Sequence, residues 1–460
     1  MSKTVQEAAR DIPVRSEADV VVVGGGLGGV AAAVAAAGTG VRTLLVERNS
    51  CVGGVATAGM CCSIFNCYYT SKGKRGTTGI AVEVADRIAA AEGFGSKWHN
   101  HKGHIIYDLE TGKQVLEEMI EEAGAEILYG AVSAGAVVEK NVIRGIIVET
   151  KTGREAILAQ TVVDATGDAD VAAAAEVPIR TFEKGRHSLC FRMGNVDVDT
   201  YVNQFRENPD HYPRNHDVEW TVEEAIAQYD DCGTFLFPHH GGPEYPPLHK
   251  AREAGALPPQ VGIQDSTDTS QMHAIRRTGI THVVTGYTHF NGLDADTITR
   301  SVLDGRRMAF TVADVFRTYV PGFTDAFVVG VAANLGVRIS RCIEGDFTFT
   351  KDMIQAGSRH PDCVGRAVGW ENRGAQCLFE DSFDVPYRCL LPRDLDGLIM
   401  GAGRSVSSDN PSVLRVMVHT MVVGQAAGTA GAIAAKTKAT PQTLDVTAVQ
   451  KELHNQGVEL

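Results

Sequence analysis

The sequence predicts an α/β fold in which a parallel sheet is extended by an antiparallel β-meander and interrupted by a second, α+β domain. Three features predict it: a strand-turn-helix-strand unit within residues 18–47, three β-rich segments between residues 131 and 159, and a strand followed by a small-residue helix after residue 396. The length of 460 residues exceeds the usual size of one hydrophobic core. A strand pattern that returns late in the chain indicates that the second domain is inserted into the first.

The first unit has the order of a dinucleotide-binding βαβ motif. Four consecutive valines at residues 20–23 are typical of a buried parallel strand, Gly24-x-Gly26-x-x-Gly29 closes the turn, and an alanine-rich helix follows to about residue 37. Gly24 permits the tight turn, Gly26 lets the backbone approach a pyrophosphate, and Gly29 lets the helix pack against the strand. The N-terminus of the helix supplies free N–H groups and a positive potential for phosphate.

The second strand of this unit, residues 42–46, is followed by an acidic residue. Glu47 stands 18 residues after Gly29, where a carboxylate can accept hydrogen bonds from both hydroxyls of an adenosine ribose. Strand, turn, helix, strand and acid in this register predict FAD or NAD as the ligand, and disfavour NADP.

The overall composition is that of a globular enzyme. Hydrophobic residues make up 44 % and charged residues 22 %, which is unlike a disordered or fibrous chain. The net charge of −13 disfavours nucleic acid as a partner, because phosphate binding calls for a basic surface. No apolar run reaches membrane-spanning length, and the first 18 residues lack the apolar core of a signal peptide. We therefore expect a cytoplasmic protein without a membrane partner, whose ten cysteines are mostly buried thiols.

The middle of the chain continues the nucleotide-binding pattern. After an amphipathic helix at 111–123 and a strand at 125–129, three β-rich segments (131–139, 142–151 and 154–159) separated by turns predict an antiparallel meander. Another apolar strand, 161–164, leads into Ala165-Thr166-Gly167-Asp168, where the chain is expected to meet the nucleotide again.

The pattern changes after residue 170 and returns after residue 390. Residues 171–386 hold no second dinucleotide fingerprint, and 208–259 read as surface excursions that partly cover a site. A strand at about 396 and a helix at 413–434 then rejoin the first domain. We predict five segments: an N-terminal arm (1–18), the first part of the nucleotide-binding domain (19–170), a substrate domain (171–390), the return of the nucleotide-binding domain (391–440) and a tail (441–460).

Further motifs follow along most of the chain: Glu47-Arg48, Gly53-Gly54-x-Ala56-Thr57-x-Gly59, VVDATGDAD at 162–170, Phe191-Arg192, Gly336-Val337-Arg338, VPYRCLLP at 385–392, Gly401-x-Gly403-Arg404, Arg415 and GQAAG at 424–428. In this order and spacing they resemble the large family of FAD-dependent oxidoreductases that shares the FAD domain of glutathione reductase and fumarate reductase. The resemblance favours FAD over NAD as the cofactor.

The resemblance implies a Rossmann-type FAD-binding domain. In such proteins a segment like 53–57 runs beside the isoalloxazine, a turn like 165–167 lies near the diphosphate and adenosine, and a segment like 401–404 approaches the ribityl phosphate. A helix opening near Val413 would point its N-terminus at the flavin pyrimidine. The residues assigned to FAD are Gly24, Gly26, Gly28, Gly29, Glu47, Arg48, Gly53, Gly54, Ala56, Thr57, Val132, Ala165, Thr166, Gly167, Asp168, Gly403, Arg404 and Val413; for Arg404 a structural ion pair is the alternative to phosphate binding.

The chain departs from the family pattern at one point. Arg338-Ile339-Ser340-Arg341 stands where relatives commonly have Arg-Glu-Thr-Arg, so an acidic partner is lost while both arginines remain. Both side chains could then serve the substrate or bind elsewhere in the structure.

Flavin transfers hydride at N5, so the protein has to position the substrate and move a proton. His419 follows Arg415 by one helical turn, so we expect the two side chains to share the helix face nearest the flavin. His289 is a candidate in the substrate domain. The further candidates are His187, Arg192, Arg341 and Tyr387, and an arginine pair would clamp a carboxylate. A surface or satisfied core position is the alternative for each histidine.

No metal is predicted. His99-x-His101-x-x-His104 and His239-His240 lack Cys or acidic partners at a known ligand spacing. Cys61, Cys62 and Cys67 follow the second glycine motif, where a redox disulfide or covalent flavin attachment is the alternative to inert thiols. Cys62 and Cys67 match the CxxxxC of disulfide reductases only in spacing.

These features predict a soluble FAD-dependent oxidoreductase, a dehydrogenase or reductase that transfers a hydride between flavin N5 and a small polar substrate, carboxylated or hydroxylated. Only one dinucleotide unit is visible, so the electron acceptor is unidentified and the oligomeric state, including a homo-oligomer, stays open. The alternatives are an FAD monooxygenase, disfavoured because GAGRSVSSDN replaces a GDAAH-type segment, and a non-catalytic FAD-binding electron-transfer subunit.

Overall fold

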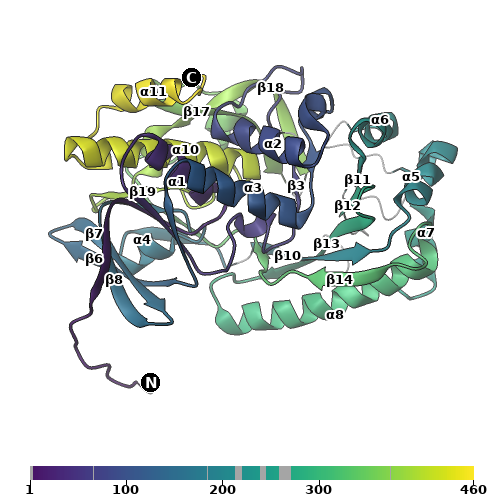
Figure 1. The fold of residues 1–460 in the computed structure, drawn as a ribbon, viewed down its shortest axis with the longest axis horizontal. Coiled ribbons are helices and arrows are strands. Elements are labelled where there is room, and N and C mark those ends of the chain that lie inside the picture. Colours follow the sequence, from purple (N-terminus) through teal and green to yellow (C-terminus); the bar gives the residue numbers. More distant parts are fainter. Residues whose placement is uncertain are drawn as a thin grey trace.

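A computed structural model describes residues 4–65, 67–183, 185–212, 220–238, 245–257, 271–372 and 375–460. These residues form two large sheets, each with its own hydrophobic core, and three two-stranded sheets. Figure 1 shows the first sheet with its helices on the left and the second sheet on the right.

The first sheet combines parallel and antiparallel pairing. Its strand order is β5-β2-β1-β8-β7-β6, and β19 also pairs with β8. The pairs β5·β2, β2·β1, β1·β8 and β19·β8 are parallel, whereas β8·β7 and β7·β6 are antiparallel. The strands are β1 (Val14–Val23), β2 (Thr43–Glu47), β5 (Glu126–Tyr129), β6 (Val132–Glu139), β7 (Val142–Thr150), β8 (Gly153–Asp164) and β19 (Leu398–Met400).

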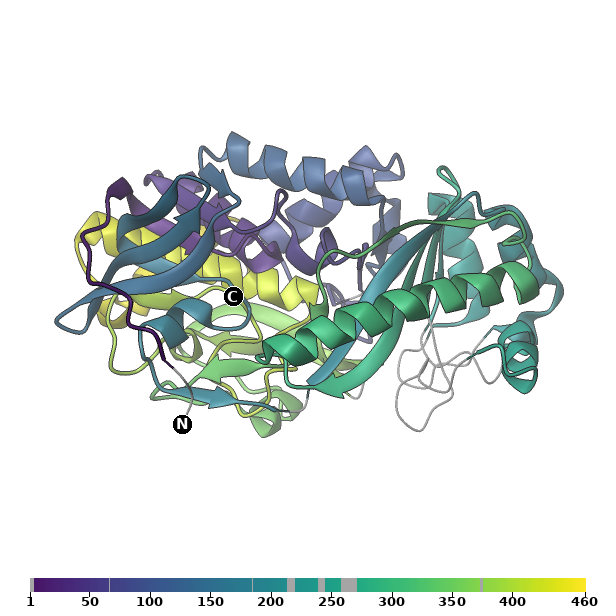
Figure 2. The same ribbon diagram turned by 90° about the horizontal axis from the view of Figure 1, so that it is seen from below.

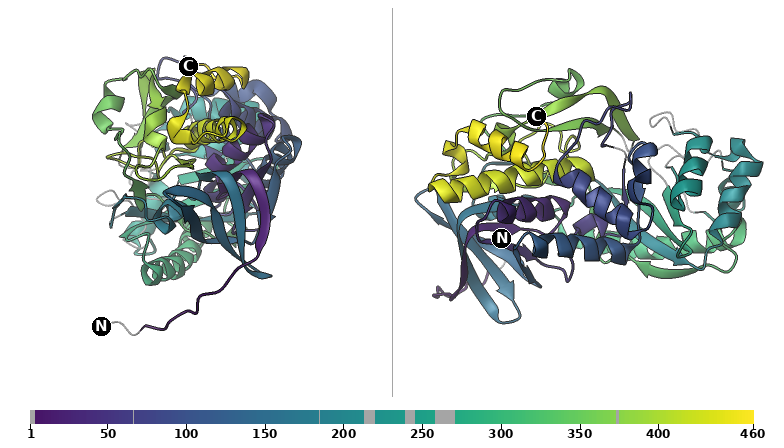
Figure 3. Two further views of the ribbon diagram at one scale, coloured as in Figure 1. Left: turned by 90° about the vertical axis from the view of Figure 1, so that its left-hand side faces the viewer. Right: turned by 45° about the horizontal axis from the view of Figure 1, so that its top comes forward.

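Two helices of small residues pack closely against this sheet. They are α1 (Leu27–Gly38) and α10 (Met417–Thr437), which lie side by side in Figures 1 and 3. A Cβ added at Gly424 would lie 2.0 Å from the carbonyl oxygen of Gly28, and one added at Gly428 would lie 2.1 Å from that of Ala32. Only residues without a Cβ let the two helix backbones approach this closely. The contact ties the C-terminal part of the chain to the first βαβ unit.

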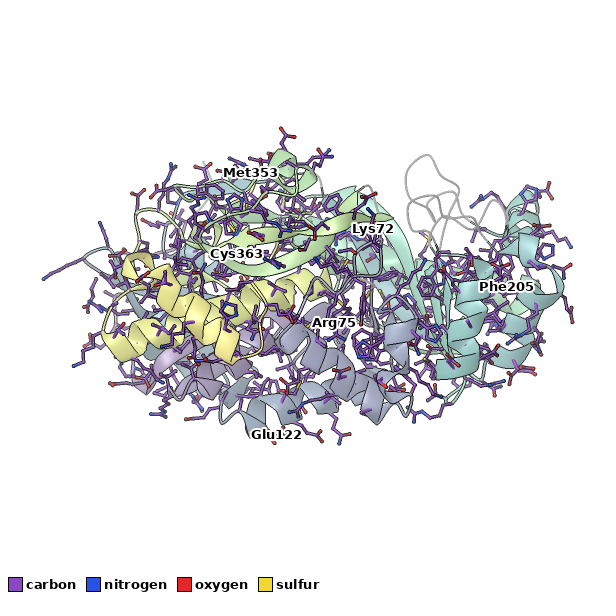
Figure 4. The ribbon with its side chains drawn as sticks, turned by 90° about the horizontal axis from the view of Figure 1, so that it is seen from above. Lys72, Arg75, Glu122, Phe205, Met353 and Cys363 are labelled. Atoms are coloured by element: carbon purple, nitrogen blue, oxygen red, sulfur yellow. The ribbon has the colours of Figure 1, made fainter. Side chains whose placement is uncertain are left out.

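The second sheet has the order β11-β12-β13-β10-β14, with β15 pairing with β10, and its described pairs are antiparallel. The long helix α8 (Ala295–Tyr319) runs along one face of this sheet, as Figure 2 shows. Phe205, Phe235 and other buried aromatic rings belong to the hydrophobic core of this second sheet. Figure 4 places Phe205 at the end of the molecule far from the first sheet. The strands are β10 (Gly185–Gly194), β11 (Thr234–Phe237), β12 (Gln271–Ile275), β13 (Ile280–Phe290), β14 (Phe327–Val331) and β15 (Gly336–Val337).

Shorter elements connect and cover the sheets. Three two-stranded antiparallel sheets pair β3 (Ser63–Ile64) with β4 (Ile105–Ile106), β9 (Ile179–Thr181) with β16 (Arg341–Ile343), and β17 (Cys363–Asn372) with β18 (Ala375–Pro386). The remaining helices are α2 (Ile80–Ala91), α3 (Leu109–Glu122), α4 (Asp170–Ala174), α5 (Val198–Glu207), α6 (Val222–Cys232), α7 (Pro246–Glu253), α9 (Lys351–Gln355) and α11 (Val446–Asn455).

The predicted α/β fold with a parallel sheet and an antiparallel meander is confirmed, and three details differ. Segments 154–159 and 161–164 form one strand, β8, which pairs with β7 over residues 153–158 and with β1 over residues 156–164. The helix expected from Val413 begins at Met417, because Val416 is extended. The tail contains a docked helix, α11, and the Gln456 amide behind it donates to the Thr39 hydroxyl at 3.0 Å.

Residues 343–390 pack with the first core rather than the second. Val364, Val368, Phe383 and Val385 all belong to the cluster formed around β1 and α1. Among the described residues, no helix combines the length and the apolar character that crossing a membrane requires.

Candidate active site

A cavity of about 390 Å³ lies where the two sheets meet. The first sheet and its loops contribute one end, and the second sheet, through Ser188, Leu236 and Val284, contributes the other. Many residues predicted to bind FAD line it: Gly24, Gly26, Gly28, Glu47, Arg48, Gly53, Gly54, Val132, Ala165, Thr166, Gly167, Asp168 and Arg404.

The turn between β1 and α1 forms one end of the cavity. Gly24 has a φ of +96°, and a Cβ there would lie 2.7 Å from the carbonyl oxygen of Ala165. A Cβ added at Gly26 meets no atom within 4 Å, so the space in front of Gly26 is open. Because α1 begins at Leu27, its first backbone N–H groups are available to an anion at this end.

Glu47 is held in a fixed orientation at the end of β2. The Gly25 N–H donates to its Oε2 at 2.6 Å, and the Asn49 N–H donates to its Oε1 at 2.8 Å. The side-chain amide of Asn49 also donates to Oε1, at 2.5 Å, so a lone pair is left for a further donor on Oε2. The carboxylate is buried and lines the cavity.

A buried carboxylate shapes the turn after β8. The Oδ1 of Asp164 accepts from the N–H and the hydroxyl of Thr166 at 3.0 and 2.7 Å, and its Oδ2 accepts from the N–H groups of Val171 and Ala172, both at 3.0 Å. Burial raises the pKa of Asp164 to about 6, and these hydrogen bonds oppose the shift. Asp164 therefore holds the segment that carries Thr166 along the cavity wall.

Arg404 forms an ion pair in this structure. Its Nη2 lies 2.9 Å from Oδ1 of Asp168, and its Nη1 donates to the Val337 carbonyl at 2.8 Å. Both residues line the cavity, so the pair forms part of the wall. This is the arrangement that the sequence offered as the alternative to phosphate binding.

These features fit a dinucleotide: an open approach at a glycine turn, helix N–H groups for phosphate and an oriented carboxylate for ribose hydroxyls. Five residues assigned to FAD lie outside the lining and have local structural contacts. The Thr57 hydroxyl donates to the Val52 carbonyl at 2.5 Å, and the N–H of Gly403 donates to the hydroxyl of Thr420 at 2.8 Å. The five are Gly29, Ala56, Thr57, Gly403 and Val413. Contact with FAD stays a prediction for these five and for the residues that line the cavity.

The opposite end of the cavity carries two arginines. Arg338, from the segment after β15, and Arg415, from the turn before α10, both line it beside Cys61. The pKa of the Cys61 thiol is lowered, mainly by a hydrogen bond with Cys190. The positive charges of the two guanidinium groups lower it further. The cavity therefore ends in a positively charged region next to a thiol.

A row of polar side chains crosses the face of the second sheet behind this end. Arg192 of β10 stands opposite His282 of β13, which stands opposite His273 of β12. Nε2 of His273 lies 3.1 Å from the hydroxyl oxygen of Ser63, and Ser63 lines the cavity. Nη1 of Arg192 lies 3.6 Å from Oδ2 of Asp108. Burial, followed by the charge of Arg192, lowers the pKa of His282 to about 3.

The sequence did not single out Ser63, His273 or His282. The period-two alternation within β10, β12 and β13 assigns each of Arg192, His273 and His282 to one of the two faces of its own strand. The alignment of those faces depends on pairing between strands far apart in the chain.

Four other predicted catalytic residues lie outside the lining: His187, Arg341, Tyr387 and His419. His419 is fully buried with its ring 6.2 Å from Phe383, and burial lowers its pKa to about 4. It does not share a helix face with Arg415, because Arg415 precedes the first residue of α10. The Tyr387 hydroxyl donates to the Pro441 carbonyl at 2.8 Å.

Arg341 and His187 are also directed elsewhere. Nη2 of Arg341 lies 2.6 Å from Oδ1 of Asp170, and Ser340 hydrogen-bonds to Asp168, so Arg341 is held by an acidic residue of α4. His187 is buried on β10, one position before the cavity-lining Ser188. The side chain of His289 lies outside the described residues.

Within the described ranges, no three His, Cys, Asp or Glu side chains gather as metal ligands. Oδ2 of Asp231 lies 3.0 Å from Nε2 of His101, and Oδ1 of Asp86 lies 3.2 Å from Nε2 of His99. His239 and His240 lie outside those ranges.

Comparison with known proteins gives one family match. The sequence model of a family described as FAD dependent oxidoreductase matches residues 19–453. Comparison with curated protein sequences finds no match.

Several solved structures are similar in fold. A geranylgeranyl bacteriochlorophyll reductase-like protein from Thermoplasma acidophilum is 14% identical over 96% of this chain and 83% of its own, with a TM-score of 0.44. The p-nitrophenol 4-monooxygenase PnpA from Pseudomonas putida DLL-E4 is 12% identical over 95% and 84%, with a TM-score of 0.43. The myxobacterial chondrochloren halogenase CndH is 12% identical over 96% and 79%, with a TM-score of 0.45.

Proposed function

Since this chain belongs to the family of FAD dependent oxidoreductases, we propose that it transfers a hydride between the flavin and a small anionic substrate, carboxylated or hydroxylated. Family membership confirms three expectations from the sequence: the resemblance itself, the FAD cofactor and an oxidoreductase activity. The hydride step, the substrate class and the residue roles are our proposal. A cytoplasmic location and the oligomeric state stay predictions.

The first sheet would hold the cofactor. The N–H groups at the start of α1 and the open approach at Gly26 would receive the diphosphate, and Glu47 would accept the ribose hydroxyls. Bound FAD would supply the atom that accepts or donates the hydride, N5 of its isoalloxazine. Gly53 and Gly54 form the adjoining wall toward the substrate end.

The observation that carries the substrate proposal is that two arginines, Arg338 and Arg415, lie at the same end of the cavity. Guanidinium groups bind carboxylates with two donors each and remain charged at every physiological pH. Trp220, Leu236 and Val284 supply apolar surface at the same end. A small molecule with a carboxylate and a reactive carbon would be oriented by such a pocket.

Ser63 and His273 are the proposed proton pathway. The Ser63 hydroxyl oxygen lies in the cavity wall and 3.1 Å from Nε2 of His273. A substrate hydroxyl that loses a hydride from its carbon must also lose its proton, and the Ser63 oxygen can accept that proton and pass one to His273.

The test is an anaerobic screen of small carboxylates and their uncharged amides, read as loss of the visible absorbance of the oxidised flavin. We expect a carboxylate to reduce the flavin and its amide to fail. Arg338→Met and Arg415→Met should each raise the KM of that carboxylate by about tenfold or more, since a charged hydrogen bond contributes about 1.5–3 kcal/mol.

The matched control is Arg393→Met, which removes an arginine paired with Glu344 at the surface. This variant should keep the KM of the unchanged protein. If no carboxylate bleaches the flavin but a nicotinamide nucleotide and oxygen together give a hydroxylated product, the hydride-transfer proposal fails and the monooxygenase alternative holds. Stable flavin with no turnover until a partner protein is added would favour the electron-transfer alternative.

A further inference from the structure

Two cysteines from distant parts of the chain meet beside the arginine end of the cavity. Cys61 lies in the segment between the second glycine motif and β3, is half-buried, and lines the cavity. Cys190 lies on β10 with an exposed fraction of 2%. The two thiols are hydrogen-bonded to each other and pack with Met60 and Val284.

The two thiols differ in their surroundings. The hydrogen bond from Cys190, with the charges of Arg338 and Arg415, lowers the pKa of Cys61 against the opposing effect of burial. The same hydrogen bond and its own burial raise the pKa of Cys190 well above the usual range. The thiolate, rather than the thiol, is the nucleophile, so Cys61 is the reactive member and Cys190 keeps its proton.

The neighbouring cysteines lack this combination. The Cys62 thiol is fully buried and lies 3.8 Å from the Ala56 carbonyl oxygen, and burial raises its pKa well above the usual range. Burial raises the pKa of Cys67 to about 12. The structure thus favours Cys61 with Cys190 over the Cys62 and Cys67 spacing considered from the sequence.

We propose that Cys61 and Cys190 form a redox-active dithiol in the cavity wall, which exchanges with low-molecular-weight anionic disulfides. Cys61 is reached from the cavity, Cys190 stands directly behind it, and Arg338 and Arg415 favour a negatively charged partner. This inference goes beyond hydride transfer and does not depend on it.

The exchange takes two displacements. The Cys61 thiolate attacks one sulfur of the disulfide RSSR, the S–S bond breaks, and RS⁻ leaves and takes up a proton. The sulfur of Cys190, losing its proton, then attacks the Cys61 sulfur of the mixed disulfide and releases the second RS⁻. The cysteine pair loses two electrons and two protons, and RSSR becomes two RSH.

The experiment follows the thiols of the purified, flavin-loaded protein. After treatment with the anionic disulfide dithiodipropionate, we expect two fewer titratable thiols and a linked peptide pair containing Cys61 and Cys190. Cys190→Ala and the isosteric Cys190→Ser should instead stop at a stable adduct on Cys61. Cys61→Ala should give neither adduct nor link at this site.

Two comparisons sharpen the test. Cys62→Ala removes the adjacent thiol, so it should leave the link between Cys61 and Cys190 intact. The protein's rate of reaction is measured with dithiodipropionate and with the cationic disulfide cystamine. Each rate is divided by the rate at which free cysteine reacts with the same disulfide. The normalised rate should be about tenfold or more higher for the anionic disulfide. Iodoacetamide should alkylate Cys61 about tenfold faster at pH 7 than the half-buried Cys232.

The proposal is overturned if the unchanged protein keeps both thiols under these conditions, or if Cys61 is linked to another cysteine. It is also overturned if Cys190→Ala and Cys190→Ser both give the same products as the unchanged protein. All of these readouts are made on sulfur, so they stand apart from whether any carboxylate reduces the flavin.

Discussion

Alanine substitutions at Gly26 and Gly29 should separate cofactor binding from folding. Gly26 caps α1 with φ −63° and ψ 174°, a conformation that alanine adopts freely, and its added Cβ meets no atom within 4 Å. The added Cβ of Gly29 would lie 1.8 Å from the carbonyl oxygen of Gly24 and 3.3 Å from the Cβ of Ala165. Gly26→Ala therefore places a methyl group in the cavity, whereas Gly29→Ala places one in overlap with the backbone.

The structure sets the size of each effect. Overlap with a rigid backbone in Gly29→Ala should cost about 3 kcal/mol of unfolding free energy. An unfolding entropy of about 2.1 cal/mol/K per residue gives about 1 kcal/mol/K for 460 residues, so the melting temperature should fall by about 3 °C. Gly26→Ala should leave the apoprotein as stable as before, or more stable by about 0.4–1 kcal/mol. Its methyl group should weaken FAD binding by about 1–3 kcal/mol, or roughly 5- to 150-fold.

Melting of the apoproteins and titration of FAD fluorescence into them measure the two effects. A wild-type Kd for FAD in Gly26→Ala would refute the placement of the diphosphate against Gly26. A melting temperature as low as that of Gly29→Ala would refute the open space in front of Gly26.

Three further predictions concern other parts of the site and core. Glu47→Ala should weaken FAD binding by about tenfold or more, because a charged hydrogen bond contributes about 1.5–3 kcal/mol, and the same fluorescence titration checks it. Ser63→Ala should lower kcat while leaving KM and FAD content unchanged, as steady-state kinetics would report; a raised KM with normal kcat would contradict the proton role. The pKa of buried His419 is lowered to about 4, so its stabilising effect is complete above pH 6.5 and is lost as pH falls toward 4. Urea titrations measure how far the free energy of unfolding falls between pH 7 and pH 5. This fall should be about 2 kcal/mol smaller in His419→Gln than in the unchanged protein. An equal fall in both proteins would contradict a buried neutral histidine.

Sequence reasoning succeeded where the interacting groups are close along the chain. The turn at Gly24, the start of α1 and the carboxylate of Glu47 fall within one βαβ unit, and their positions follow from backbone geometry that a short segment specifies. The helix at 413–434 was predicted but its start was misplaced, because the extended backbone of Val416 delays the first turn and separates Arg415 from His419.

The substrate end of the cavity depends on contacts between distant residues. Ser63 and His273 are 210 positions apart, and Cys61, in the segment before β3, meets Cys190 on β10. A register shift between His187 and Leu189 also intervenes, so the sequence pattern of β10 does not say which alternate residues face the cavity.

Local patterning was thus enough to specify the nucleotide unit, its glycines and its acid, since strand and helix periods arise from neighbouring residues. The pocket next to it, with Arg338, Arg415 and the Cys61–Cys190 pair, is formed by loops and one strand that the docking of the two large sheets brings together. Such docking is set by the packing of whole faces, and a one-residue change in strand register exchanges every side chain that a face presents.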